Sequence, residues 1–496
     1  MTRRDWLAAT LVGVGVVLAR LPFAARELWA WDSVLYARAL EGGFHVGFDL
    51  DAQRPHAPGY ILYVALADLF RRSGADASQA LVVVSILASG LGAAALFLLA
   101  RRFTSAPVAA LAALGYALNP LAWMYGEIAY PYALLGALAV TLAGAFWWAR
   151  HQADARATYL VSFAFGLVSG FRQDLLLLLG VLWLWTAWPR GPRAVAASGA
   201  LVLGGIAVWL VPSAALSGGL VTYLQALGAQ TDFVRTTYSV PAQGVDALSY
   251  NLRFTVYALA WGLLGFGVLL VGLLLTPVLA WLRAPSRIRA PRPEGPAAFF
   301  LAWLAPGLLF YVLVHIGEWG YVLSVLPGLY VLTAALTERL VRRVDPAGRR
   351  AWSVAGAALV LVPALLFVGT PQRFSAAAIA SHDTALRARV DYVKRTFDAE
   401  QTVILAREDF LLVRYYLPRY RAWLYDPQPH GTEAAKRKRA MRTTAMVIFT
   451  DGLVPRQGLE LRSVEVAPGI RLAYVPLEPG SVIEFYGNRY TVRERQ

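Results

Sequence analysis

The 496-residue chain is 58% hydrophobic and only 16% charged, with a formal net charge of +15 and no cysteine. A soluble protein of this length needs more charge to cover its surface, so the composition indicates a polytopic membrane protein. The lack of cysteine excludes disulfides and cysteine-ligated metal sites. Much of the arginine lies in short connectors between apolar segments, where it acts as a topology signal, and we expect no nucleic-acid partner.

A membrane-spanning helix needs about 20 apolar residues. Segments of this kind predict spans over residues 6–23, 79–100, 106–124, 131–149, 194–213, 253–281, 297–314, 320–337 and 352–370. A further apolar segment, 158–189, is interrupted by Arg172, Gln173 and Asp174, and a single helix would bury all three near its middle. We therefore predict two short helices folded back at these residues, which gives about eleven spans in all.

The first two spans are separated by a long first outer loop, residues 24–78. Its apolar run Gly59–Phe70 is about 12 residues long, too short to cross a membrane, and we expect an interfacial or re-entrant helix. With this assignment, arginine is concentrated in the connectors on one side, which the positive-inside rule makes cytoplasmic. The sequence thus predicts a multi-pass protein of the plasma membrane, with residues 1–23 as a first anchor and the N-terminus in the cytoplasm.

The composition changes after residue 370, where long apolar runs end. We divide the chain into a membrane domain, 1–370, and an extracytoplasmic domain, 371–496. The second domain has helical patterns over 382–397 and 408–417. Strand patterns occur over 402–406, 421–425, 445–450, 459–466, 471–475 and 482–492. The sequence therefore predicts an α/β or α+β domain attached to a polytopic α-helical membrane protein.

The first outer loop carries several acidic residues that could take part in chemistry. Asp32 lies in an amphipathic stretch, where an acid beside Ser33 can also be a helix N-cap. Asp49 and Asp51 form a D-x-D pair that could hold a divalent cation, although a solvated turn explains them as well. His56, in a proline-rich segment after Arg54, is either a turn residue or a contact for a phosphate or hydroxyl group.

Other polar residues lie at the predicted outer ends of later spans. Glu127 follows the third span, where a carboxylate at membrane level is costly unless it faces a cavity. Arg172 and Asp174 are at the tip of the predicted hairpin and could simply pair with each other. Glu318 lies in another outer connector, and a solvated turn would explain it. Together with Asp32, these residues are predicted at the same membrane face.

With these residues in place, the chain resembles the GT-C class of membrane glycosyltransferases, which includes protein O-mannosyltransferases and lipid A aminoarabinose transferases. The resemblance covers the layout of residues 1–370. Its local matches, in chain order, are WDSVLYARALE, RPHAPGYILY, GEIAYPYAL and GYVLSVLPGLY. It implies transfer of a sugar from a polyprenyl-phosphate donor to a lipid, glycan or protein acceptor outside the cytoplasm. The sequence identifies no definite cofactor, and a divalent cation at Asp49 and Asp51 is one candidate.

The resemblance also implies roles for particular residues. Asp32 matches the catalytic first-loop aspartate of the class, and Glu127 matches its second-loop acid. The chain has Asp32-Ser33 where many relatives have Asp-Glu, and Gln53-Arg54-Pro55 where the aminoarabinose type has Glu-Lys-Pro. The second departure removes the lysine contact of the aminoarabinose type, which weighs against aminoarabinose as the sugar and against a dependence on metal. The expected substrate contacts are Arg54, His56, Tyr60, Tyr132, Arg172, Glu318 and Tyr321.

Two other functions fit a polytopic chain of this kind. A transporter or flippase of lipid-linked saccharides would also have polar residues and a broken hairpin, but the two halves show no inverted repeat. A ligase or polymerase of lipid-linked polymers would normally carry its large loop late in the chain. Here the long loop comes first, which favours the transferase.

Overall fold

The computed structural model describes residues 1–47, 53–283, 295–342, 346–425, 439–450, 460–486 and 489–493. The chain forms two compact units: Met1–Ala24 with Tyr36–Ile379, and Ala25–Leu35 with Ala380–Gln496. Residues 25–35 of the first outer loop thus belong with the carboxyl-terminal part of the chain. The sequence pattern alone groups them with the membrane domain.

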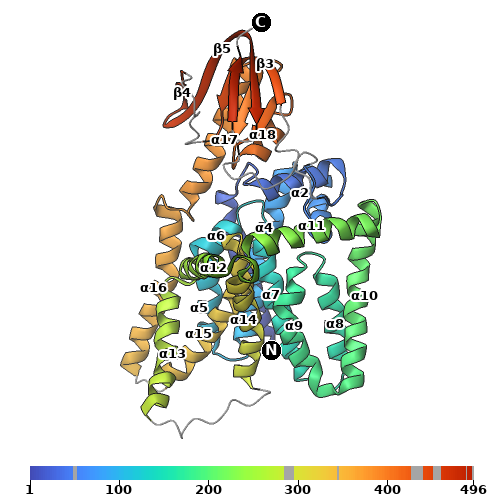
Figure 1. Cartoon of the computed structure of the whole chain (residues 1–496). Coiled ribbons are helices and arrows are strands. Elements are labelled where there is room, and N and C mark those ends of the chain that lie inside the picture. The colour runs from blue at the N-terminus through green and yellow to red at the C-terminus, as the bar shows by residue number, and fades with distance from the viewer. Residues whose placement is uncertain are drawn as a thin grey trace. The chain divides into compact units, whose positions relative to one another are not determined.

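The first unit is helical (Figure 1). Its early helices are α1 (Arg3–Arg20), η1 (Leu21–Phe23), α3 (Ile61–Arg72), α4 (Ala77–Ala100), α5 (Ala106–Ala117), α6 (Pro120–Tyr125) and α7 (Tyr132–Arg150). Helix α2 (Trp31–Gly42) begins in the second unit and continues into the first from Tyr36. The hairpin region and the segments after it form α8 (Arg156–Val168), α9 (Asp174–Ala187), η2 (Trp188–Arg190), α10 (Pro192–Leu216), α11 (Leu220–Tyr238) and α12 (Val240–Leu263). The last are α13 (Gly265–Arg283), α14 (Pro296–Leu313), η4 (Trp319–Ser324), α15 (Leu326–Val341) and α16 (Pro346–Gly369).

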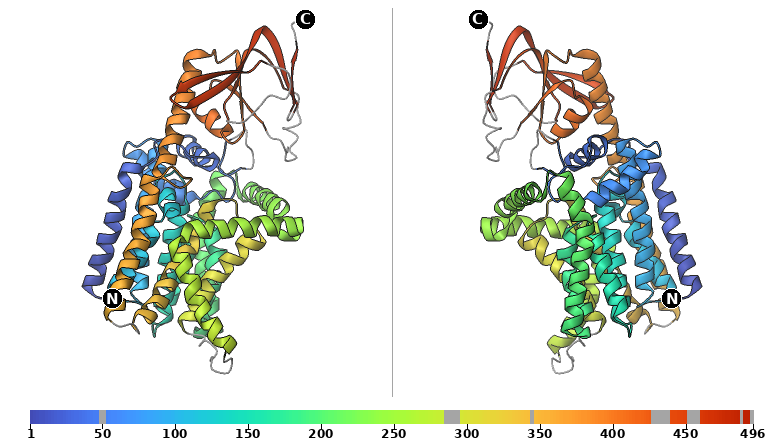
Figure 2. Two further views of the ribbon diagram at one scale, coloured as in Figure 1. Left: turned by 90° about the vertical axis from the view of Figure 1, so that its left-hand side faces the viewer. Right: turned by 90° about the vertical axis from the view of Figure 1, so that its right-hand side faces the viewer.

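In the described part of the chain, five helices are long and apolar enough to cross a membrane: Arg3–Phe23, Ala77–Ala100, Tyr132–Arg150, Pro192–Leu216 and Pro296–Leu313. The bent pair α12 and α13 would make a sixth. Leu7, Leu11 and Leu18 of α1 are exposed, and Figure 2 shows α1 at the edge of the helical unit, as expected for a lipid-facing helix. The chain is a multi-pass membrane protein, and the count of eleven spans stays a prediction.

The short elements of the first outer loop and of the hairpin are confirmed. Most of the run Gly59–Phe70 lies in the 12-residue helix α3, Ile61–Arg72. The segment 158–189 forms α8 and α9, with the break at Ser169–Gln173 where the polar residues lie. Figure 1 shows α8, α9 and α10 side by side, and the pairs among them are in contact.

Three predicted single spans are broken, which corrects the sequence-based prediction. Residues 106–124 form α5 and α6, separated at Asn119, whose side-chain oxygen accepts from the backbone N–H of Leu121. Residues 253–281 bend by 106° between α12 and α13, where Leu264 has a φ of 44°. Residues 320–337 change from the 3-10 helix η4 to α15 at Val325. Proline, glycine and a capping side chain end helices without lowering hydropathy, so an apolar run alone does not reveal such breaks.

The second unit contains a mixed sheet of strands β1 (Thr402–Ala406), β2 (Arg421–Leu424), β3 (Arg439–Ile448), β4 (Arg462–Ala467), β5 (Ile470–Tyr486) and β6 (Arg489–Arg493). The strand order is β2-β1-β3-β5-β4, with β6 paired to β5. β1 is parallel to β2 and β3, whereas β3, β4 and β6 are antiparallel to β5. Val403, Leu405, Trp423, Met446 and Ile483 belong to the buried core of this sheet.

Two helices accompany the sheet: α17 (Ala376–Thr396) and α18 (Phe410–Tyr416). The Tyr420 hydroxyl donates to the backbone oxygen of Phe397 at 2.9 Å and so ties the loop before β2 to the end of α17. The predicted strand over 482–492 is wrong as a single element, because it comprises the end of β5 and the antiparallel β6. Strand periodicity continues across a tight hairpin, so only turn residues could mark the reversal.

Candidate active site

The first unit holds a buried ion pair at the break between α8 and α9. The Arg172 guanidinium bonds both carboxylate oxygens of Asp174, with Nε–Oδ1 at 3.2 Å and Nη2–Oδ2 at 2.6 Å. The Arg172 side chain is 2% exposed and that of Asp174 17%. The pairing considered from the sequence is therefore present. It uses the Nε and Nη2 edge of the guanidinium and leaves the N–H groups of Nη1 to other acceptors.

Three of the tyrosines predicted as substrate contacts surround this guanidinium. The Arg172 Cζ atom lies 4.8 Å from the ring centroids of Tyr60 and Tyr132 and 5.4 Å from that of Tyr321. The rings come from the start of α3, the start of α7 and the helix η4, so three distant segments meet at one side chain. Cation–π contacts of this kind stabilise a buried cation by about 0.5–2 kcal/mol each.

Close packing within this tyrosine cluster depends on one glycine. A Cβ atom on Gly320 would lie 2.3 Å from Cγ of Tyr132, so no larger residue fits beside that ring. Next to it, the Tyr125 hydroxyl donates to the Glu318 carboxylate at 3.1 Å, and the Tyr125 and Tyr132 rings are 5.2 Å apart. Glu318 is thus joined to the cluster through Tyr125, which was not among the residues predicted from the sequence.

Buried polar atoms near the cluster lack partners in the part of the chain that the structure describes. Both the Nε2 and the Oε1 atoms of Gln173, the residue after Arg172, are buried without a hydrogen bond. The Nδ1 atom of His56 is in the same state, and its ring packs edge-on against Tyr60 at 6.4 Å. Such groups cost free energy unless a ligand or water pairs with them. Arg172, Gln173 and His56 therefore offer donors and acceptors to a polar ligand.

Glu127 lies in a separate cluster, in the connector between α6 and α7. Its Oε1 atom accepts from Trp123 Nε1 at 2.8 Å and is 3.7 Å from Nη1 of Arg20. Arg20 also donates to the backbone oxygen of Trp123 at 2.7 Å, and a Cβ on Gly126 would come within 2.8 Å of its guanidinium carbon. These contacts belong to Glu127 and not to the Arg172 cluster.

The ionisation of Glu127 is altered by its surroundings. Burial raises the pKa of Glu127 to about 8, although the Arg20 guanidinium and the Trp123 hydrogen bond act in the opposite direction. Within the described residues its Oε2 atom is buried and has no hydrogen bond. An acid whose pKa lies near neutral can take up and release a proton at working pH. Arg20 was missed from the sequence because it ends an ordinary apolar helix.

Asp32 belongs to the second unit. It is half-buried in the first turn of α2, which begins at Trp31. Ser33, not Asp32, makes the local contact at this helix start, because the Ala30 N–H donates to Ser33 Oγ at 3.4 Å. An acidic residue in the first turn stabilises a helix through the helix dipole.

The other residues predicted from the sequence, Arg54, Asp49 and Asp51, do not lie in either of these clusters as far as the structure describes them. Arg54 is exposed in the loop before α3, where its side chain packs against Gly47. Asp49 and Asp51, the candidates for metal binding, lie outside the described residues. Among the residues that are described, no group of three or more His, Asp or Glu side chains could hold a metal ion.

No protein-family model and no curated protein matches this sequence. Solved structures do match it. ArnT from Cupriavidus metallidurans bound to undecaprenyl phosphate aligns with a TM-score of 0.56 and 14% identity, over 96% of this chain and 98% of that one. Its apo form aligns with a TM-score of 0.56 and 15% identity, over 94% and 97%. An oligosaccharyltransferase of Archaeoglobus fulgidus, solved with Zn and sulfate, gives 0.52 and 12%, over 90% and 67%.

The chain has the GT-C fold. At these identities the likeness concerns the arrangement of the backbone, and the roles of individual side chains have to be argued from this chain. The alignment with ArnT extends over nearly the whole length of both proteins, so it includes the carboxyl-terminal unit as well as the helices. Within the first unit, the Arg172 cluster combines a buried cation, three tyrosine rings and buried polar atoms that have no hydrogen bond within the described residues.

Proposed function

We propose that this protein is a membrane glycosyltransferase that moves a hexose or pentose from a polyprenyl-phosphate-linked donor to an extracytoplasmic lipid, glycan or protein. The observation that carries the proposal is the GT-C fold over 96% of the chain. A buried cluster of one cation, three tyrosines and unpartnered polar groups supports it. In this proposal the membrane part has about eleven spans and the N-terminus is cytoplasmic.

The reaction needs a base for the acceptor and charge compensation for the leaving group. A bond forms between the acceptor oxygen and the anomeric carbon, the bond from that carbon to the phosphate oxygen breaks, and the acceptor proton passes to a base. We assign Asp32 as this base. The polyprenyl phosphate leaves with the bonding electrons, so a cation beside it lowers the barrier.

Arg172 is the cation that we assign to the leaving phosphate. Asp174 holds one edge of the guanidinium, and the three tyrosine rings hold its plane. The Nη1 edge can then donate to a phosphate oxygen without reorganising, which is the condition for efficient electrostatic stabilisation. Arg54 and His56 are assigned as further contacts for the phosphate.

The hydroxyl groups of the sugar and of the acceptor need both hydrogen-bond donors and hydrogen-bond acceptors as partners. Gln173 supplies a donor and an acceptor, and Glu127 and Glu318 are assigned to orient hydroxyl groups. The rings of Tyr60, Tyr132 and Tyr321 offer apolar faces to a sugar. A divalent cation at Asp49 and Asp51 remains part of the hypothesis, and the Zn in the A. fulgidus structure is compatible with it.

The test uses the full-length protein in liposomes with a radiolabelled polyprenyl-phosphate sugar. We expect release or transfer of labelled sugar, and a loss of at least a hundredfold in Asp32→Asn, because a general base contributes about 10²–10⁴ to a rate. Glu41→Gln, on the exposed face of the same helix, is the matched control and should keep its activity. Full activity in Asp32→Asn would remove the central assignment. Movement of intact donor across the bilayer without bond cleavage would instead establish the flippase.

A further inference from the structure

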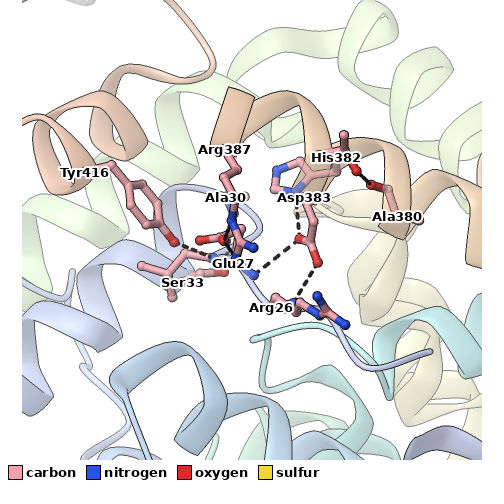
Figure 3. A network of polar contacts seen from close by, with 11 residues as sticks. Arg26, Glu27, Ala30, Ser33, Ala380, His382, Asp383, Arg387 and Tyr416 are labelled. Carbon is pink, nitrogen blue, oxygen red and sulfur yellow. Dashed lines mark hydrogen bonds and ion pairs between the residues drawn. The ribbon is translucent and has the colours of Figure 1, made fainter. Parts of the chain in front are cut away.

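The segment Ala25–Leu35, which leads into Asp32, is held by side chains that lie some 350 residues later in the chain. The backbone N–H groups of Arg26 and Glu27 donate to the two carboxylate oxygens of Asp383, at 2.7 and 3.3 Å. The next N–H, of Leu28, donates to the Tyr416 hydroxyl at 2.9 Å. Three consecutive backbone donors are thus satisfied by α17 and α18. Figure 3 shows Asp383, Arg387 and Tyr416 directed at this segment.

Side chains of the segment make the remaining contacts. The Glu27 carboxylate accepts from both Nε and Nη2 of Arg387, with the Nε–Oε1 distance 3.0 Å. The Trp31 indole N–H donates to the backbone oxygen of Glu408. The rings of Trp29 and His382 lie 4.3 Å apart, and Leu28 is fully buried. Almost every residue from 26 to 31 is therefore tied to the carboxyl-terminal unit.

The irregular backbone of this segment makes its conformation depend on these contacts. Residues 24–30 form no helix or strand, so their N–H groups have no partner within a regular element. Without Asp383 and Tyr416 the segment would have to find other acceptors, and its conformation would change. Asp32 comes directly after it, in the first turn of α2. Its position is thus coupled to the contacts made by residues 26–31.

We propose that Asp383, Arg387 and Tyr416 of the carboxyl-terminal unit are positioning residues, which hold the Ala25–Leu35 segment so that Asp32 is correctly placed for transfer. The proposal rests on the proposed function of Asp32, and it gives the carboxyl-terminal unit a direct part in the reaction. None of the three side chains belongs to the hydrophobic core of the sheet around Val403, Leu405 and Trp423, so exchange at β1 and β3 can report separately on folding.

The test compares Asp383→Asn, Arg387→Gln and Tyr416→Phe with wild type in the full-length protein. Hydrogen exchange should become faster at residues 25–35 and stay unchanged at β1 and β3. In the liposome assay kcat should fall on the order of tenfold to a hundredfold, since small misplacements of a reacting group have effects of that size. The KM for the donor should change by less than about threefold. Arg387→Lys should restore part of the kcat.

A control and two contrary outcomes complete the design. Arg395→Gln removes the same charge from the exposed end of α17, away from this network, and should match wild type in exchange and in kcat. Unchanged exchange at residues 25–35 in Asp383→Asn and Tyr416→Phe would overturn the proposal. Faster exchange with unaltered kcat would overturn it as well.

The exchange measurement needs no activity, so it is independent of the proposed function. If wild type transfers no sugar, or Asp32→Asn retains full activity, the assignment of Asp32 fails and the positioning role fails with it. The exchange data then show separately whether Asp383, Arg387 and Tyr416 hold the segment.

Discussion

Each unit of the protein contains an arginine that bonds a carboxylate through two nitrogens, and the two pairs differ in burial. Arg172 and Asp174 have side chains that are 2% and 17% exposed, and three tyrosines surround the cation. Arg387 is 55% exposed while its partner Glu27 is 12% exposed. Water screens the exposed Arg387 cation more than the buried Arg172 cation, so the two pairs should have different energetic consequences. We infer that the buried pair stabilises the fold, whereas the exposed pair mainly fixes the position of the Ala25–Leu35 segment.

The largest effect should come from removing the buried cation. Arg172→Met leaves the Asp174 carboxylate without its partner and removes the contacts with three rings, so the free energy of unfolding should fall by about 3–5 kcal/mol. Equilibrium unfolding in mixed detergent micelles measures this change. Arg235→Met is the matched control, because Arg235 and Asp232 form an exposed pair in the same unit and should contribute less than about 1 kcal/mol. Equal losses in the two variants would contradict the role assigned to burial.

A double variant separates the charge from the packing. Asp174→Asn in the Arg172→Met background removes the uncompensated carboxylate and should recover part of the lost stability. No recovery would mean that the tyrosine contacts, and not the ion pair, account for the effect of Arg172.

His315 tests what burial does to a basic side chain whose pKa shift has burial as its cause. It lies in the connector after α14, near the rings of Tyr238 and Tyr321, and burial lowers its pKa to about 4. The folded state favours the neutral ring, whereas the unfolded chain takes up a proton near pH 6.5. The free energy of unfolding is therefore highest above pH 6.5 and falls as the pH is lowered from 6.5 to 4. The loss should reach up to about 3 kcal/mol, at 1.36 kcal/mol for each pKa unit.

The measurement is the pH dependence of unfolding between pH 4 and 7 for wild type and His315→Gln. The variant should lose most of the dependence that wild type shows over this range, whereas His151→Gln, which replaces an exposed histidine, should keep it. Identical curves for wild type and His315→Gln would show that acid destabilises the unit through other groups.

How far the sequence predicts these features depends on whether the signal is local. The strand over 402–406 and the helix break at Arg172–Asp174 were predicted because period, length and polar interruptions are visible within a short window. The bend near Leu264 was missed because hydropathy stays high on both sides of it. The membrane class and the GT-C fold were predicted from composition and from the order of segments. A missed bend changes neither, so these two predictions were unaffected.

The candidate sites were harder to predict for the same reason. Arg172 and its tyrosines were named singly, but the sequence does not state that segments around residues 60, 132 and 321 meet at one guanidinium. Arg20, the partner of Glu127, had no signal at all, because a lone arginine at the end of an apolar helix is usually a topology residue. The contact of residues 26–28 with Asp383 and Tyr416 spans more than 350 residues and leaves no periodic pattern.

The smallest expected change in stability concerns the exposed pair. Arg387→Gln should lower the free energy of unfolding of the carboxyl-terminal unit by less than about 1 kcal/mol, because solvent already screens the charge. Raising the salt concentration to about 1 M, where the Debye length is about 3 Å, should speed exchange at residues 25–35 in wild type and have little further effect in Arg387→Gln. A loss of several kcal/mol in this variant would place Arg387 with Arg172 as a support of the fold. A small loss, combined with slower transfer and faster exchange at residues 25–35, is the result we expect if the pair fixes the position of the segment and contributes little to the stability of the unit.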